Sequence, residues 1–75
     1  MTTLEVVFRY GMPPGAQQMR ALDSVREVYG IRRMRFDEKE RTVRIEYDAT
    51  RLDADVVAGM LRDAGLDVRE RVALV

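Results

Sequence analysis

The sequence predicts an α+β fold in which a four-stranded antiparallel sheet carries two helices on one face. Three observations predict it. Apolar residues alternate with a period of two in several short stretches, two other stretches repeat apolar residues every three or four positions, and a glycine follows each of these helical stretches. The resulting order along the chain is strand, helix, strand, strand, helix, strand.

The first strand and the first helix occupy the first 29 residues. The side chains of the strand that are expected to point inward are Leu4, Val6, Phe8 and Tyr10. The helix is expected over residues 14–29, because Pro14 is tolerated at a helix start and Gly30 suits the left-handed position beyond a helix end. Its apolar stripe consists of Ala21, Leu22, Val25, Val28 and Tyr29.

A hairpin, a second helix and a last strand follow. Strands expected around residues 31–36 and 43–47 flank a charged turn at 37–41. Asp53 is the expected N-cap of the second helix, and Gly65 is expected to end it before a last strand. This order is typical of a ferredoxin-like βαββαβ sandwich with strand order 4-1-3-2, so that the second and fourth strands form the edges.

Size and composition restrict the function. The 75 residues are expected to form one domain, 1–75, with a core of about 3–70 and an apolar tail at 71–75. The 13 basic and 13 acidic side chains cancel, so net charge draws the chain neither to nucleic acid nor to an anionic membrane. The absence of Cys and His removes thiol chemistry, the usual soft-metal ligands and the commonest general base. Without an apolar run of about 20 residues, no membrane insertion is expected, and the cytoplasm is the expected location.

Several short motifs keep a fixed spacing from Gly11 to Val68. They are Gly11-Met12, Gly30-Ile31, Met34, Phe36, Val43, Ile45, Tyr47-Asp48, Ala64-Gly65-Leu66 and Val68. In this spacing the chain resembles the heavy-metal-associated domain, the module of copper chaperones and of soluble domains in copper- and zinc-transporting ATPases. The resemblance implies the same sandwich fold and a role in metal homeostasis.

The chain departs from that family at the metal loop. The two cysteines that the family uses to hold Cu(I) fall on Pro14 and Gln17. Proline has no side-chain ligand and glutamine has only a hard amide oxygen, whereas Cu(I) prefers thiolate. We therefore expect neither a metal site nor a cofactor. The first strand is also shifted by one residue against the family pattern, through a bulge or a different loop start, so the core position of the family's methionine is not carried over to Met12.

Without its thiols, the loop is interpreted as a docking corner for a protein partner. A rigid Pro13-Pro14 pair beside apolar side chains offers a contact that loses little entropy on binding. The alternative interpretation is an ordinary turn that starts a helix. The candidate docking residues are Met12, Pro13, Pro14, Gly15, Gln17 and Leu66.

The remaining clusters have structural interpretations. Met34 and Met60 are expected in the core, while Met12 and Met19 leave open a weak thioether site. The outer face of the sheet is expected to mix both signs of charge without the stacking aromatics that RNA-binding sheets use. Its residues would be Glu5, Arg9, Arg33, Arg35, Arg44, Glu46 and Arg69. The only serine, Ser24, has no histidine to activate it, so no enzyme activity is expected.

We therefore expect a non-catalytic interaction module, with a component of a metal-transport system as its partner. Two alternatives remain open: metal handling through methionines or a partner's thiols, and a regulatory dimer that binds a small ligand. The chain is expected to be a monomer or a homodimer that pairs through its last strand, because exposed apolar edges tend to pair. The apolar residues of that edge are Val72, Leu74 and Val75.

Overall fold

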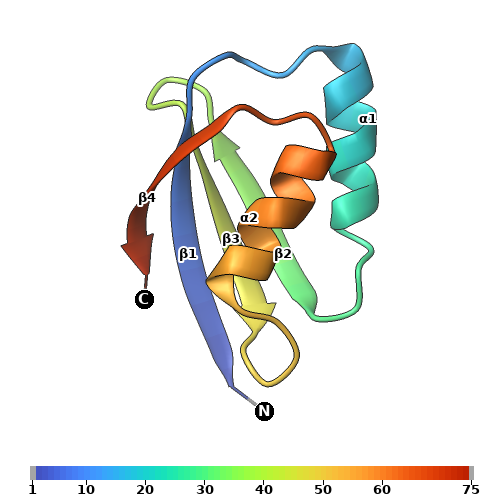
Figure 1. The fold of residues 1–75 in the computed structure, drawn as a ribbon, viewed down its shortest axis with the longest axis vertical. Helices are drawn as coiled ribbons and strands as arrows, with labels where there is room; N and C mark the ends of the chain where they lie inside the picture. The colour runs from blue at the N-terminus through green and yellow to red at the C-terminus, as the bar shows by residue number, and fades with distance from the viewer. Residues whose placement is uncertain (1, 75) are drawn as a thin grey trace.

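The computed structural model describes residues 2–74, with side chains over 2–72. Its elements are β1 (Thr3–Tyr10), α1 (Ala16–Val25), β2 (Ile31–Asp37), β3 (Thr42–Asp48), α2 (Ala54–Asp63) and β4 (Val68–Leu74) (Figure 1). The strands form one antiparallel sheet in the order β2-β3-β1-β4. The ferredoxin-like fold, its strand order and its two edge strands are confirmed.

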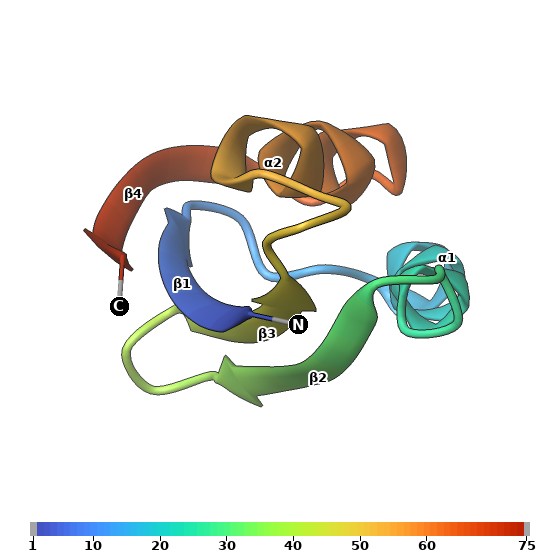
Figure 2. The same cartoon turned by 90° about the horizontal axis from the view of Figure 1, so that it is seen from below.

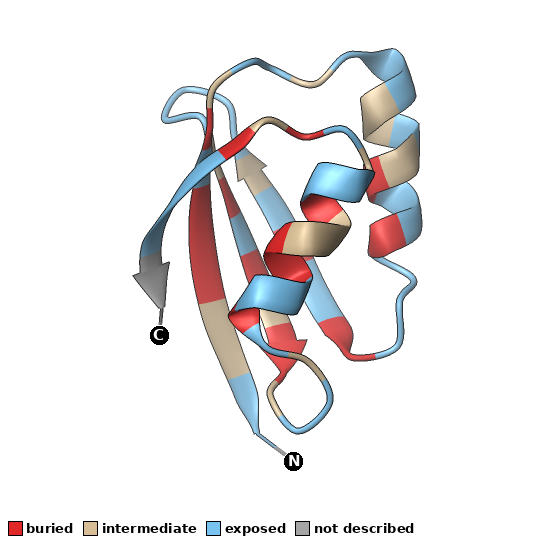
Figure 3. Cartoon of the chain, viewed as in Figure 1, coloured by how far each residue is buried: buried red, intermediate tan, exposed pale blue. Residues whose placement is uncertain are grey.

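The core is one apolar layer between the inner face of the sheet and the two helices. The sheet is curved, and both helices lie on its concave side (Figure 2). The central strand β1 contributes Val6, Phe8 and Tyr10, and α2 contributes Val57 and Leu61. Buried segments therefore lie in the middle of the sheet and on the facing sides of the helices (Figure 3).

The irregularity expected in the first strand lies on the side of β1 that pairs with β4. On the other side, β1 pairs with β3 in unbroken register from Thr3↔Asp48 to Arg9↔Thr42. The register with β4 shifts twice, between Val7 and Phe8 and between Arg9 and Tyr10. Phe8 and Tyr10 are both buried in the core, so they point inward, as the alternation of apolar residues along this strand predicts.

Helix α1 starts later than the sequence indicates. Gly15 has an extended backbone just before the first helical residue, Ala16. The Gln18 side-chain Oε1 accepts a hydrogen bond from the Gly15 N–H at 3.0 Å and so satisfies a donor at the helix start. Pro14 therefore precedes the helix instead of occupying its first turn.

The same helix ends earlier than expected, at Val25. The N–H groups of Glu27 and Val28 donate to carbonyls three residues back, at 3.1 and 3.0 Å, which tightens the chain into turns. The prediction that Val28 and Tyr29 belong to the apolar helix stripe is wrong, because both side chains are exposed. Tyr29 is 70% exposed, and its ring is covered by the Arg51 guanidinium, 4.1 Å from the ring centroid.

Helix α2 follows its sequence signals closely. The Asp53 carboxylate accepts a hydrogen bond from the Val56 N–H at 2.9 Å, which confirms it as the N-cap. Gly65 adopts a φ of 98°, a left-handed conformation that favours glycine, and turns the chain toward β4. Strand β4 then runs to Leu74 alongside β1, although the apolar side chains expected at Leu74 and Val75 lie outside the described residues.

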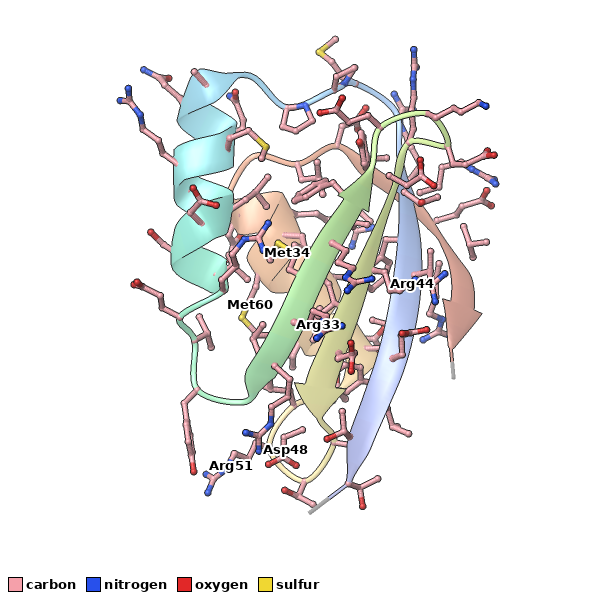
Figure 4. All side chains as sticks on the ribbon, turned by 180° about the vertical axis from the view of Figure 1, so that it is seen from behind. Arg33, Met34, Arg44, Asp48, Arg51 and Met60 are labelled. Atoms are coloured by element: carbon pink, nitrogen blue, oxygen red, sulfur yellow. The ribbon has the colours of Figure 1, made fainter. Side chains whose placement is uncertain are left out.

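Asp48 organises the end of the sheet where β3 stops. Its side chain is 1% exposed, and its Oδ1 accepts hydrogen bonds from the Thr50 hydroxyl at 2.6 Å and the Thr50 N–H at 3.0 Å. Arg51 lies 3.7 Å from its other oxygen (Figure 4). Arg32 lies 3.8 Å from the same oxygen. The Asp48 N–H also donates to the Gly30 carbonyl at 2.7 Å, so the turns before β2 and after β3 are tied together.

None of the helices in residues 2–74 is long and apolar enough to span a membrane.

Replacing Leu61 with alanine is expected to lower the free energy of unfolding by about 2 to 5 kcal/mol, because the change opens a cavity in the apolar layer. Val56→Ala is the control on the same helix, since Val56 is 47% exposed. It should change the value by no more than about 0.5 kcal/mol. Urea denaturation of the three proteins measures both effects. Equal losses in the two variants would contradict the packing.

The Asp48 network predicts a sensitivity to acid. Hydrogen bonds from the Thr50 side chain and backbone, aided by Arg32 and Arg51, hold the pKa of Asp48 below its ordinary value. Its stabilising contribution is therefore present above about pH 4 and is lost as the pH falls below that. Asp48→Asn should flatten the decline in unfolding free energy between about pH 4 and pH 2, measured by urea midpoints. The control is Asp63→Asn on the surface of α2; an Asp48→Asn curve as steep as the wild-type curve would refute this role.

Candidate functional site

The loop of residues 11–15 connects β1 to α1 at the end of the sheet opposite Asp48 (Figure 1). The Gly11 N–H donates to the Asp67 carbonyl at 2.9 Å, and the Met12 N–H donates to the Asp67 carboxylate at 3.1 Å. From the other side, the Arg41 guanidinium donates to the Gly11 carbonyl at 3.0 Å. The start of the loop is thus fixed to the hairpin turn and to the segment before β4.

Gly11 permits this close approach. A Cβ atom at this position would lie 2.6 Å from both the Arg69 Nε and the Asp67 Oδ2, well inside ordinary contact distance. These two atoms also hydrogen-bond to each other at 3.0 Å. A side chain at residue 11 would therefore disturb the interaction that positions the loop.

A pocket of about 300 Å³ lies between this loop, the first turns of α1 and the end of β2. We call it the corner pocket; it is lined by Tyr10, Pro13, Pro14, Met19, Phe36 and Glu38. The rings of Tyr10 and Phe36 meet edge to face, with centroids 6.0 Å apart and an interplanar angle of 67°. The lining is mostly apolar, with one carboxylate.

Two carboxylates, those of Glu38 and Asp37, act on the Tyr10 phenol in the corner pocket. Burial is the main cause that raises the pKa of the Tyr10 phenol, and the carboxylate of Glu38 raises it further. Arg41 acts in the opposite direction, and Asp37 adds to the rise. The phenol of Tyr10 is therefore neutral at physiological pH, and Glu38 is the charged group of the lining.

A second hollow of about 320 Å³ lies on the other side of the loop and is lined by Met12, Pro13, Pro14, Gly15, Gln18, Gly65 and Asp67. Pro13 and Pro14 line both hollows and form a ridge between them. Met12 is 72% exposed, so it does not fill the core.

The structure brings together four of the six predicted docking residues, Met12 to Gly15, around the second hollow. Gln17 is exposed on α1 and lies outside both linings; its neighbour Gln18 occupies the second hollow instead. Leu66 is 3% exposed and belongs to the core, so it supports the corner from beneath and offers no surface.

The sequence interpretation did not include Tyr10, Met19, Phe36 and Glu38 in the site. A signal for the two aromatic residues was present, because both are inward positions close to the ends of their strands. The strand register shows why the two side chains lie close together. Phe36 of β2 pairs with Val43 of β3, and Arg9 of β1 pairs with Thr42, so Tyr10 lies one residue beyond the start of β3. The two rings meet over that end of the intervening strand.

The four methionines in the described part of the chain do not gather at one site. Met12 lines the second hollow, whereas Met19 lines the corner pocket. Met34 is buried, and Met60 packs against the core, which confirms their predicted places (Figure 4). Within the described part of the chain, no group of three or more His, Cys, Asp or Glu residues is placed to hold a metal ion.

The outer face of the sheet carries the expected charge pairs. Arg33 lies 3.6 Å from Glu46 (Figure 4). Arg44 lies 2.6 Å from Glu5. The other pairs are Arg9 with Glu70 and Arg69 with Asp67, while Arg35 lies opposite Arg44 in the β2–β3 register. Exposed pairs of this kind stabilise a fold by at most about 1 kcal/mol each.

No model of a known protein family matches this chain, and no curated protein matches it either. The strand order shows the ferredoxin-like fold independently of any relative. The link to the heavy-metal-associated domain rests on motif spacing alone.

Titration of Tyr10 tests the electrostatics of the corner pocket. Its phenol should ionise at a higher pH than that of N-acetyltyrosinamide, and Glu38→Gln should lower this pKa because it removes a negative charge. Ring-carbon NMR shifts of the assigned tyrosine measure both values. Because the pKa in the folded state is the higher one, the stabilisation from burying the neutral phenol is present below about pH 10 and is lost at higher pH.

Glu40→Gln is the control for this titration, since it removes a carboxylate from the same turn outside the pocket lining. A Tyr10 pKa that stays the same in Glu38→Gln, or moves equally in both variants, would contradict the assignment of Glu38 to the pocket.

Proposed function

We propose that this protein is a non-catalytic interaction module that binds a protein partner through the corner formed by residues 11–15. The observation that carries the proposal is the ridge of Pro13 and Pro14, which stands between two hollows. Exposed Met12 extends the apolar surface beside it. Unbranched methionine adapts its shape to a partner and is common at binding surfaces.

The corner is also arranged to bind with little loss of entropy. Proline fixes its own φ and restricts the residue before it, so the Pro13-Pro14 pair has few conformations to lose. Hydrogen bonds from Gly11 and Met12 to Asp67, and from Gly15 to Gln18, hold the backbone on both sides of the pair. Affinity at such a site comes from apolar contact without the cost of ordering a loop.

The metal-homeostasis context is the finer part of the proposal and is supported by the motif spacing. In the family that the sequence resembles, the corresponding loop holds a soft metal between two cysteines. Pro14 and Gln17 at those positions supply no thiolate, so this chain would act through the shape of the loop. Its proposed partner is a component of a metal-transport system, recognised at the surface that a metal-carrying relative would present.

Pro14→Asp tests the corner, because a carboxylate placed on the apolar ridge would have to be desolvated in the complex. The amount of a partner that immobilised protein captures from cell extract should fall by about tenfold or more, which corresponds to at least about 1.4 kcal/mol. Val56→Asp adds the same charge at an exposed position of α2, away from the corner, and should capture as much as the wild type.

Urea denaturation would establish that both variants are folded. A captured protein counts as a partner when purified material binds the wild type and Val56→Asp and shifts the amide NMR signals of residues 11–19. Equal capture by wild type and Pro14→Asp would overturn the proposed function.

A further inference from the structure

We propose that the corner pocket receives the side chain of a lysine or arginine presented by the protein partner. The aliphatic part of that side chain would lie against Tyr10 and Phe36, and its charge would meet Glu38. This inference rests on the proposed function and specifies the chemistry of the partner.

The volume of the pocket limits what it can hold. At about 300 Å³ it lies at the lower end of the range for small-molecule sites in proteins. A single long side chain suits this size better than a drug-sized ligand or a docked helix does. A partner would therefore place one residue in the pocket while its backbone runs along the Pro13-Pro14 ridge.

The walls suit a side chain with an apolar stem. Tyr10, Phe36 and the two prolines supply apolar surface, and Met19 is flexible enough to adapt to it. Lysine and arginine bury their methylene stems on such surfaces while they keep the charged end near water. The two rings meet edge to face and do not stack on each other, and aromatic ring faces attract cations.

The charge of the pocket selects a cation. Glu38 is the charged residue of the lining, and within residues 2–72 its carboxylate has no salt-bridge partner within 4.0 Å and accepts no hydrogen bond. Among the cations of this region, Arg41 is hydrogen-bonded to the Gly11 carbonyl at 3.0 Å. Arg35 and Arg44 line a neighbouring hollow together with Glu38, and Arg44 pairs with Glu5 at 2.6 Å. Lys39 is exposed on the same turn and does not line the pocket. Burial is the main cause of the raised pKa of Tyr10; Glu38 and Asp37 raise this pKa further, and Arg41 lowers it.

Other occupants fit less well. An acidic side chain would be repelled by Glu38. A leucine or phenylalanine would cover the Glu38 carboxylate without giving it a partner, and desolvating an unpaired charge is costly. A basic side chain satisfies both the apolar walls and the carboxylate.

Peptide binding tests this inference directly. The probes are three pentapeptides with a central lysine, arginine or norleucine flanked by glycines, added to ¹⁵N-labelled protein at low salt, where charge contacts are least screened. The lysine and arginine peptides should give saturable amide shifts at residues 11–15, 19 and 36–38. They should bind about 1.5- to fivefold more tightly than the norleucine peptide, the range that an exposed charge contact provides.

Glu38→Gln should remove this preference, because the lysine and arginine peptides lose their charge partner and the norleucine peptide no longer covers an unpaired carboxylate. The norleucine peptide should bind this variant at least as tightly as the wild type, which also shows that the apolar walls are intact. Glu40→Gln removes one carboxylate from the same turn and should retain the preference. The inference is overturned if norleucine binds as tightly as lysine, if Glu38→Gln keeps the preference, or if no peptide shifts the pocket signals.

Failure here is distinguishable from failure of the proposed function. If Pro14→Asp loses a partner that wild type binds, yet no basic peptide is preferred, the corner still docks a partner and only the chemistry of its pocket is wrong. If Pro14→Asp retains all partners, the proposed function fails regardless of how the peptides behave.

Discussion

A single layer of apolar side chains between the inner face of the sheet and the two helices holds this chain together. A domain of this size has no second core, so each inward position must be covered by a helix or a loop. The corner pocket arises where that cover is incomplete. Tyr10 and Phe36 extend the apolar layer to the end of the sheet, but α1 begins only at Ala16, and the loop before it covers the two rings with prolines.

The two ends of the sheet are stabilised by different interactions. At one end, Asp48 ties two turns together: its buried carboxylate accepts a hydrogen bond from Thr50, and its backbone N–H donates to the Gly30 carbonyl. At the other end, the loop is held through its backbone, by Asp67 and Arg41, which leaves its side chains free to face outward. A rigid backbone that presents apolar side chains is suited to bind a partner without first being ordered.

Much of the fold follows from sequence patterns, because strand alternation, the Asp53 cap and Gly65 are local signals. The limits of α1 do not, since Val28 and Tyr29 continue the helical spacing after Val25 while the chain has already turned. The candidate docking position of Pro13 and Pro14 could be named from the sequence alone. The corner pocket could not, because Tyr10 and Phe36 come together only through the register of two strands with a third.

The central claim is that this corner is the surface that meets a partner, and hydrogen exchange of the complex tests it most directly. With a partner bound, mass spectrometry should show slower amide exchange at residues 10–19 and 36–41 and unchanged exchange at Arg33, Arg44 and the rest of the outer sheet face. Slower exchange on that outer face or along the exposed side of α2, with residues 10–19 unaffected, would contradict the account.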